Sequence, residues 1–123
     1  MAGRAKILVV DDAPEFVYAI RLFLEDLGYD VVTAYNGKEA VEVLERESPD
    51  LVLLDGIMPL MDGWETLSAI RRRPSWQRLP VIMLTGLEEA QQRMESYDRG
   101  CTDLMSKPID DYDQLALLIE RML

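Results

Sequence analysis

Five short apolar runs alternate with stretches of helical periodicity along the chain, and this alternation limits the possible fold more than any other feature. Apolar runs of this length are typical of strands that are buried on both faces of a sheet. They cover Lys6–Val10, Asp30–Ala34, Asp50–Asp55, Leu79–Leu84 and Asp103–Ser106. Strands that alternate with helices form a parallel sheet with helices on both faces. The sequence therefore predicts one doubly wound α/β domain over residues 1–123, with five parallel strands in the order 2-1-3-4-5.

Capping and stop residues limit the expected helices. These run from Pro14 to Gly28, from Asn36 to Ser48, from Asp62 to just before Pro74, over Glu88–Asp98 and from Asp111 to Met122. Proline suits a first helical turn and glycine suits a helix stop. Asn36 with Glu39, and Asp62 with Glu65, have the spacing of capping boxes. These signals predict a helix after every strand.

The composition excludes several classes of function. A net charge of −10 argues against nucleic acid or an anionic membrane as the direct partner, and Arg71–Arg73 is expected to be a solvated helix end. The chain has no histidine, so any histidine chemistry must come from a partner. Cys101 is the only cysteine and is expected to be a buried thiol. The start is unlike a signal peptide and no apolar run approaches about 20 residues, so we expect a cytoplasmic protein.

Four of the five expected strands end at residues that can carry chemistry. Asp11 and Asp12 follow the first strand, Asp55 ends the third, Thr85 follows the fourth and Lys107 follows the fifth. Each has an ordinary explanation when taken alone, because Asp and Thr cap helices and Lys is usually solvated. The carboxyl ends of parallel strands meet at one edge of the sheet, where ligands bind. Their joint placement therefore predicts a functional crevice.

The motifs around these residues resemble the receiver domain of bacterial two-component response regulators, including the single-domain chemotaxis type. The segments VVDDAP, LLDGIMPLMDGWE, MLTG and SKPID carry this resemblance, which extends from Lys6 to Leu123. It implies a flavodoxin-like fold and a signalling switch that is phosphorylated, rather than an enzyme that acts on a metabolite. It also implies a sensor histidine kinase or a histidine phosphotransfer protein as the phosphoryl donor, and an effector protein or output domain downstream.

The resemblance assigns a Mg²⁺ site to the crevice. It implies that Asp11 and Asp12 hold the ion together with Asp55, and that the backbone carbonyl of Ile57 is a further ligand. Several carboxylates in one crevice repel one another unless a cation neutralises them. Mg²⁺ prefers hard oxygen ligands and keeps several of its waters, so two or three carboxylates suit it well.

The resemblance also assigns the phosphorylation chemistry. Asp55 is the expected phosphoacceptor, Lys107 the conserved lysine and Thr85 the switch hydroxyl. A cis peptide bond is expected between Lys107 and Pro108, although cis is a minority state of such bonds. At position 104 the family usually has an aromatic residue, whereas this chain has Leu104, so the usual aromatic part of the switch is in question.

Two other functions fit part of the pattern. A small phosphatase of the haloacid dehalogenase type also uses Asp, Mg²⁺, Thr or Ser, and Lys. That family places its two aspartates two residues apart after the first strand, whereas Asp11 and Asp12 are adjacent. A degenerate receiver that only holds partners together is the other alternative. The intact site residues argue against it, and Leu104 weakly favours it.

Overall fold

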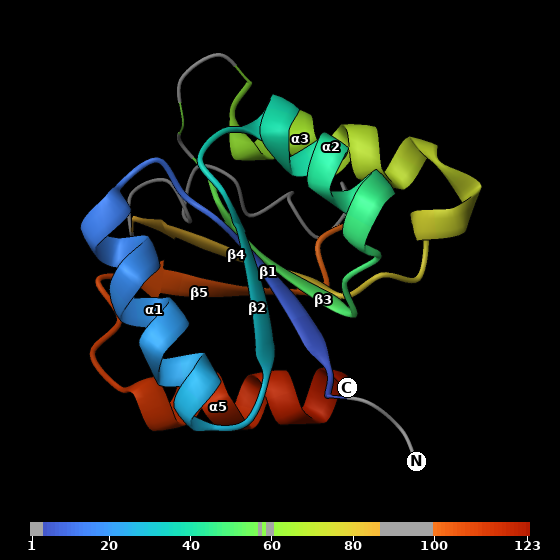
Figure 1. The fold of residues 1–123 in the computed structure, drawn as a ribbon. Helices are drawn as coiled ribbons and strands as arrows, with labels where there is room; N and C mark the ends of the chain where they lie inside the picture. The colour runs from blue at the N-terminus through green and yellow to red at the C-terminus, as the bar shows by residue number, and fades with distance from the viewer. Residues whose placement is uncertain (1–3, 57, 59–60, 87–99) are drawn as a thin grey trace.

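A five-stranded parallel sheet forms the centre of the structure (Figure 1). The computed structural model describes residues 4–56, 58, 61–86 and 100–123. The strands are β1 (Lys6–Val10), β2 (Asp30–Ala34), β3 (Leu51–Asp55), β4 (Val81–Gly86) and β5 (Asp103–Lys107). They pair in parallel in the order β2-β1-β3-β4-β5, which confirms the predicted topology.

The prediction for β4 was wrong at both ends. Leu79 belongs to the preceding turn, because its amide donates to the carbonyl of Trp76 at 3.2 Å. At the other end, Thr85 and Gly86 continue the strand because they pair with residues of β5. The shift extends the sheet by two residues on the side where the candidate site lies.

Helices cover both faces of the sheet. They are α1 (Pro14–Asp26), α2 (Gly37–Glu47), α3 (Gly63–Arg72) and α5 (Tyr112–Met122), with a 3₁₀ helix η1 (Pro74–Trp76). The helices α1 and α5 lie on one face, and α2 and α3 lie on the other (Figure 1). The helix expected over Glu88–Asp98 lies outside the described residues.

The helix starts follow the predicted capping residues in part. A complete capping box joins Asp62 and Glu65, whereas Asn36 only accepts a hydrogen bond from the amide of Glu39. The helix α1 has proline in its first turn, as expected, but its N-cap is Ala13. Neither Asp11 nor Asp12 is therefore the N-cap residue of α1.

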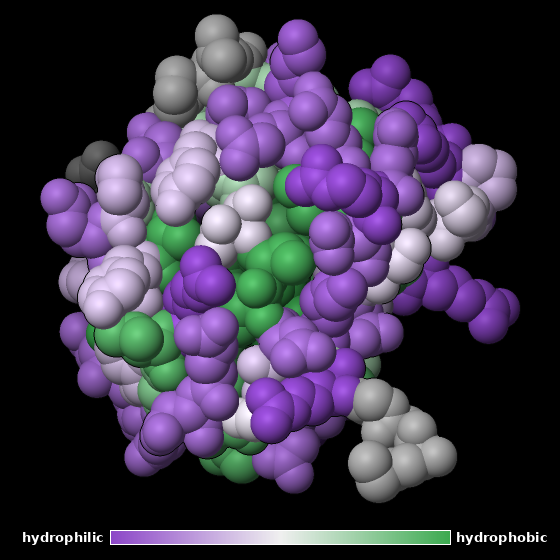
Figure 2. Space-filling view, viewed as in Figure 1, coloured by the Kyte–Doolittle hydropathy of each residue, from purple (hydrophilic) through white to green (hydrophobic). Residues whose placement is uncertain are grey.

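Each face of the sheet has its own hydrophobic core. Alternate strand residues point to opposite faces, so Leu8 and Leu54 pack with α2 and α3, while Ile7 and Leu53 pack with α1 and α5. In the view of Figure 2, hydrophilic side chains cover most of the surface and apolar ones show over β2, between the two helix layers. Cys101 is buried, as predicted. Within the described residues, no helix is long and apolar enough to cross a membrane.

Arg71 corrects the expectation for the arginine cluster. Its guanidinium donates to the backbone carbonyls of Gly100 at 2.7 Å and Trp76 at 2.8 Å. Burial lowers the pKa of the Arg71 guanidinium. Arg72 and Arg73 are exposed, as a solvated helix end requires, but Arg71 joins α3 to the loops that precede β4 and β5.

Candidate functional site

Three carboxylates meet at the carboxyl edge of the sheet, as predicted. Asp11 and Asp12 follow β1, and Asp55 is the last residue of β3. One oxygen from each of the three lies within 4.8 Å of the others. Asp11 and Asp55 are buried, with 1% and 7% of their surface exposed, while Asp12 is open to solvent. This donor set suits a hard divalent cation, because such ions prefer carboxylate oxygens and retain waters on the open side. Ile57 lies outside the described residues.

Lys107 brings the opposite charge into this crevice. Its ammonium nitrogen lies 2.7 Å from Oδ2 of Asp11 and 3.6 Å from Oδ1 of Asp55. Its peptide bond to Pro108 is cis, which confirms that prediction. Three carboxylates less one ammonium leave two negative charges, which a divalent cation would neutralise.

Hydrogen bonds of the backbone and of the side chain fix the orientation of the Asp11 carboxylate. Its amide continues the strand ladder by donating to the carbonyl of Ala34 at 3.1 Å. Its Oδ1 accepts a hydrogen bond from the amide of Ala13 at 2.9 Å, and its Oδ2 contacts Lys107. Both carboxylate oxygens thus have a donor, which offsets the cost of burying the charge.

Thr85 lies on β4, the strand beside β3, and it is close to Gly56, the residue that follows Asp55. The Gly56 amide donates to the carbonyl of Leu84 at 3.3 Å, which fixes the end of β3 against β4. A methyl group at position 56 would lie only 2.8 Å from Oγ1 of Thr85. The buried threonine hydroxyl therefore lies close to Gly56, the residue that follows Asp55.

Leu104 lies on β5 beside this threonine. Met83 pairs with Leu104, and Thr85 pairs with Ser106, so Leu104 and Thr85 are on the same face of the sheet. The leucine side chain is half-buried against the core beneath α2 and α3. Leu104 thus lies on the strand next to that of the predicted switch hydroxyl and on the same face of the sheet, where an apolar side chain takes the expected aromatic position.

Phe16 is a site residue that the sequence analysis did not identify. Its ring centroid lies 4.3 Å from the Lys107 ammonium, within the range of a cation–π contact. In the sequence, Phe16 shows only the helical spacing of a core position, because Ile20 follows four residues later. The available signal was its place in the first turn of the helix that follows Asp11 and Asp12.

The fold and the crevice define an α/β protein with a metal-compatible anionic site at the carboxyl edge of its sheet. A family model for the response regulator receiver domain matches residues 7–120. An uncharacterized 14.6 kDa protein in the sodA1 3′ region of Leptolyngbya boryana is 40% identical over 112 residues, which cover 91% of this chain and 86% of that protein. Response regulator Rre1 of Synechocystis is 36% identical, over 100% of this chain and 53% of Rre1.

A solved structure agrees with these relatives. The chemotaxis protein CheY4 of Vibrio cholerae matches with a TM-score of 0.90 at 30% identity, over 98% of this chain and 100% of that one. The chain belongs to the response regulator receiver domain family. The general function of this family is that of a phosphorylation-activated switch in two-component signalling. The chain spans about half of the length of Rre1.

Proposed function

We propose that Asp55 of this chain accepts a phosphoryl group from a phosphohistidine of a partner, either a sensor histidine kinase or a histidine phosphotransfer protein. The single observation that carries the proposal is that Asp55 lies close both to two other carboxylates and to an ammonium group. Asp55 belongs to the acidic cluster, and the Lys107 ammonium lies 3.6 Å from its Oδ1. The chain has no histidine, so the donor histidine belongs to the partner.

Phosphoryl transfer mainly requires that the protein positions the reacting groups and neutralises their charge. A carboxylate oxygen of Asp55 attacks phosphorus, and the bond from phosphorus to the donor imidazole breaks as the acyl phosphate forms. Asp11, Asp12 and Asp55 would hold Mg²⁺, which neutralises charge on the phosphoryl oxygens when it is bound. Lys107 would neutralise a phosphoryl oxygen from the other side.

The signal would then leave the site through Thr85. The phosphoryl group adds about 1.5 to 2 negative charges and new acceptor oxygens next to Gly56. The Thr85 hydroxyl is close to that glycine and can donate to one of them. Leu104 cannot add the hydrogen bond or the bulk of an aromatic switch residue, so we propose a smaller shift between the inactive and active states.

We further propose that residues 1–123 form one cytoplasmic receiver domain that catalyses only its own phosphorylation and dephosphorylation. Its output would be an effector protein or an output domain. Rre1 is nearly twice as long as the segment that it shares with this chain, which supports an output domain in that regulator. Family membership also supports a signalling role here rather than turnover of a metabolite.

Labelling with acetyl phosphate tests the assignment of Asp55. With Mg²⁺ and no kinase, intact-mass spectrometry should show one added phosphoryl group, because position and charge supply most of the catalysis. Asp55→Asn should not be labelled. Asp50→Asn, just before the other end of β3, is the matched control and should be labelled like the wild type. Equal labelling of Asp55→Asn would show that the acceptor is a different residue.

A further inference from the structure

The first turn of α1 places an aromatic ring against the lysine of the site. Phe16 is the third residue of the helix, and its ring centroid lies 4.3 Å from Nζ of Lys107. The Phe16 side chain is half-buried and packs on the core beneath α1 and α5, so its orientation is held by the helix and by its neighbours. A ring that is fixed in this way presents its negative face to the ammonium.

The other contacts of this ammonium are with carboxylates that could also hold a metal ion. Lys107 lies 2.7 Å from Asp11 and 3.6 Å from Asp55, and both belong to the cluster that can hold a metal ion. Cation binding and phosphorylation both draw charge away from these ion pairs. The ring uses no carboxylate oxygen, so its attraction for the ammonium persists in both events.

We propose that Phe16 is a positioning residue for phosphoryl transfer, which keeps the Lys107 ammonium in the crevice within reach of Asp55. A lysine has a flexible four-carbon stem, so its ammonium group can occupy many positions once its ion pairs weaken. The Phe16 ring limits the number of these positions. An ammonium group that is already in place need not be ordered during the reaction. This inference rests on the proposed phosphorylation of Asp55.

The chain offers a matched set of variants. Phe16→Leu keeps apolar bulk and removes the ring, whereas Phe16→Tyr keeps the ring. The chain has two phenylalanines, and the other, Phe23, is also half-buried on α1 but packs its ring on Tyr112, with centroids 5.1 Å apart. Phe23→Leu therefore makes the same chemical change on the same helix without touching Lys107.

Proton NMR of the unphosphorylated chain without Mg²⁺ tests the contact itself. A ring face shields the protons above it, so the ε-methylene protons of Lys107 should resonate upfield of those of Lys6, which contacts Glu47 instead. The shift should persist in Phe16→Tyr and Phe23→Leu and disappear in Phe16→Leu. An unshifted Lys107 in the wild type would overturn the proposal.

The rate of acetyl phosphate labelling at Asp55 tests the effect on the reaction. We expect roughly a fivefold lower rate constant in Phe16→Leu, in line with a cation–π contact at a partly exposed site. Phe16→Tyr and Phe23→Leu should stay within about twofold of the wild type. An unchanged rate in Phe16→Leu, or an equal loss in both leucine variants, would overturn the role of Phe16 alone. A wild-type chain that takes no phosphoryl group would overturn the proposed function as well.

Discussion

The loop after Asp55 returns to its own strand at Gly63. The Gly63 amide donates to the carbonyl of Gly56 at 3.0 Å, and Gly63 is the first residue of α3. A methyl group at position 63 would overlap the backbone carbonyl of Asp55. Glycine is thus required here by a close approach of two backbone segments, and this approach sets where the loop after Asp55 closes.

Replacement of this glycine should destabilise the protein. We expect Gly63→Ala to lower the free energy of unfolding by about 2 to 4 kcal/mol, because backbone must move to make room. Gly86→Ala is the control, since a methyl group there meets no described residue within 4 Å; its effect should stay within about 0.5 kcal/mol. Urea unfolding measures both. Equal stabilities of the two variants would show that the backbone near Gly63 can accommodate a methyl group.

Asp12 offers a test of the metal site that spares the fold, because its side chain is exposed. Asp12→Ala should weaken Mg²⁺ binding by roughly tenfold or more, since it removes a ligand of the proposed ion. Titration of Mg²⁺ followed by tryptophan fluorescence measures this. Asp26→Ala, an exposed residue at the end of α1, should bind Mg²⁺ like the wild type. Unchanged affinity in Asp12→Ala would remove Asp12 from the site.

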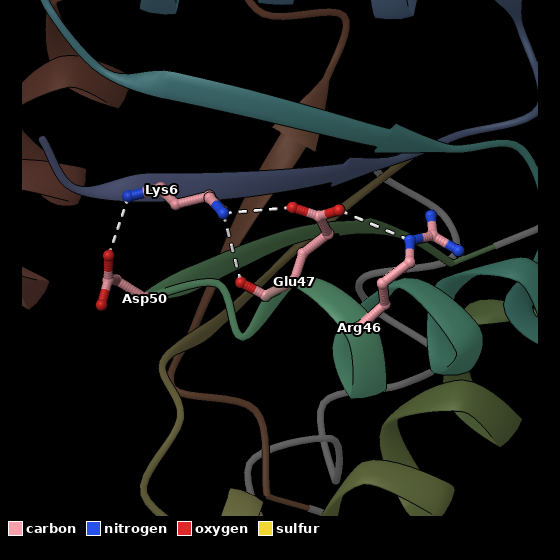
Figure 3. A network of polar contacts seen from close by, with 4 residues as sticks. All are labelled: Lys6, Arg46, Glu47 and Asp50. Atoms are coloured by element: carbon pink, nitrogen blue, oxygen red, sulfur yellow. Dashed lines mark hydrogen bonds and ion pairs between the residues drawn. The ribbon is translucent and has the colours of Figure 1, made fainter.

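At the scale of elements, a polar network joins the start of β1 to the end of α2 (Figure 3). The Lys6 ammonium donates to the backbone carbonyl of Glu47 at 3.3 Å and to its carboxylate at 3.1 Å. The Lys6 amide donates to Asp50, and Arg46 donates to the other carboxylate oxygen of Glu47. These contacts hold the edge of the sheet that lies opposite the carboxylate crevice.

This network should make part of the stability depend on pH. The hydrogen bond from Lys6 is the main cause that lowers the pKa of the Glu47 carboxyl below its ordinary value of 4.5, and Arg46 adds to it. A lowered pKa means that the stabilisation is present above pH 4.5 and is lost as the pH falls through the folded-state value.

The difference in unfolding free energy between the wild type and Glu47→Gln should therefore be small but measurable at pH 7, because the pair is partly exposed. It should shrink as the pH falls below about 4.5. Urea unfolding at several pH values measures it. Glu45→Gln, which loses the ion pair with Arg73 instead, is the control for a general charge effect. A difference that grows in acid would contradict the assignment.

At the scale of the whole molecule, the site and the predicted switch lie on neighbouring strands of one sheet. The proposed phosphorylation site, Asp55, lies at the end of β3, Thr85 lies on β4, and Leu104 lies on β5. Because Leu104 is smaller than an aromatic residue, less of the signal should pass to β5. The response should concentrate at Thr85 and in the segment after it; residues 87–99 lie outside the described residues.

Beryllofluoride, a mimic of the acyl phosphate, tests this route. Backbone NMR shifts should change most at residues 85–89 and in the following segment, and little around Leu104 and α5. Leu104→Tyr restores the usual aromatic side chain and should extend the changes into β5. Larger changes around Leu104 than at residues 85–89 in the wild type would show that the signal takes another route.

The sequence by itself determined the strand order, the carboxylate cluster and the place of Thr85 and Lys107, because apolar runs and the residues at strand ends are local signals. Only the tertiary structure decided the contacts between distant segments. Phe16 meets Lys107, Gly63 passes the Asp55 carbonyl, and Arg71 is held by the carbonyl of Gly100. Each of these depends on how α1 and α3 pack on the sheet, and no periodicity or motif specifies which side chain then lies within contact distance of another.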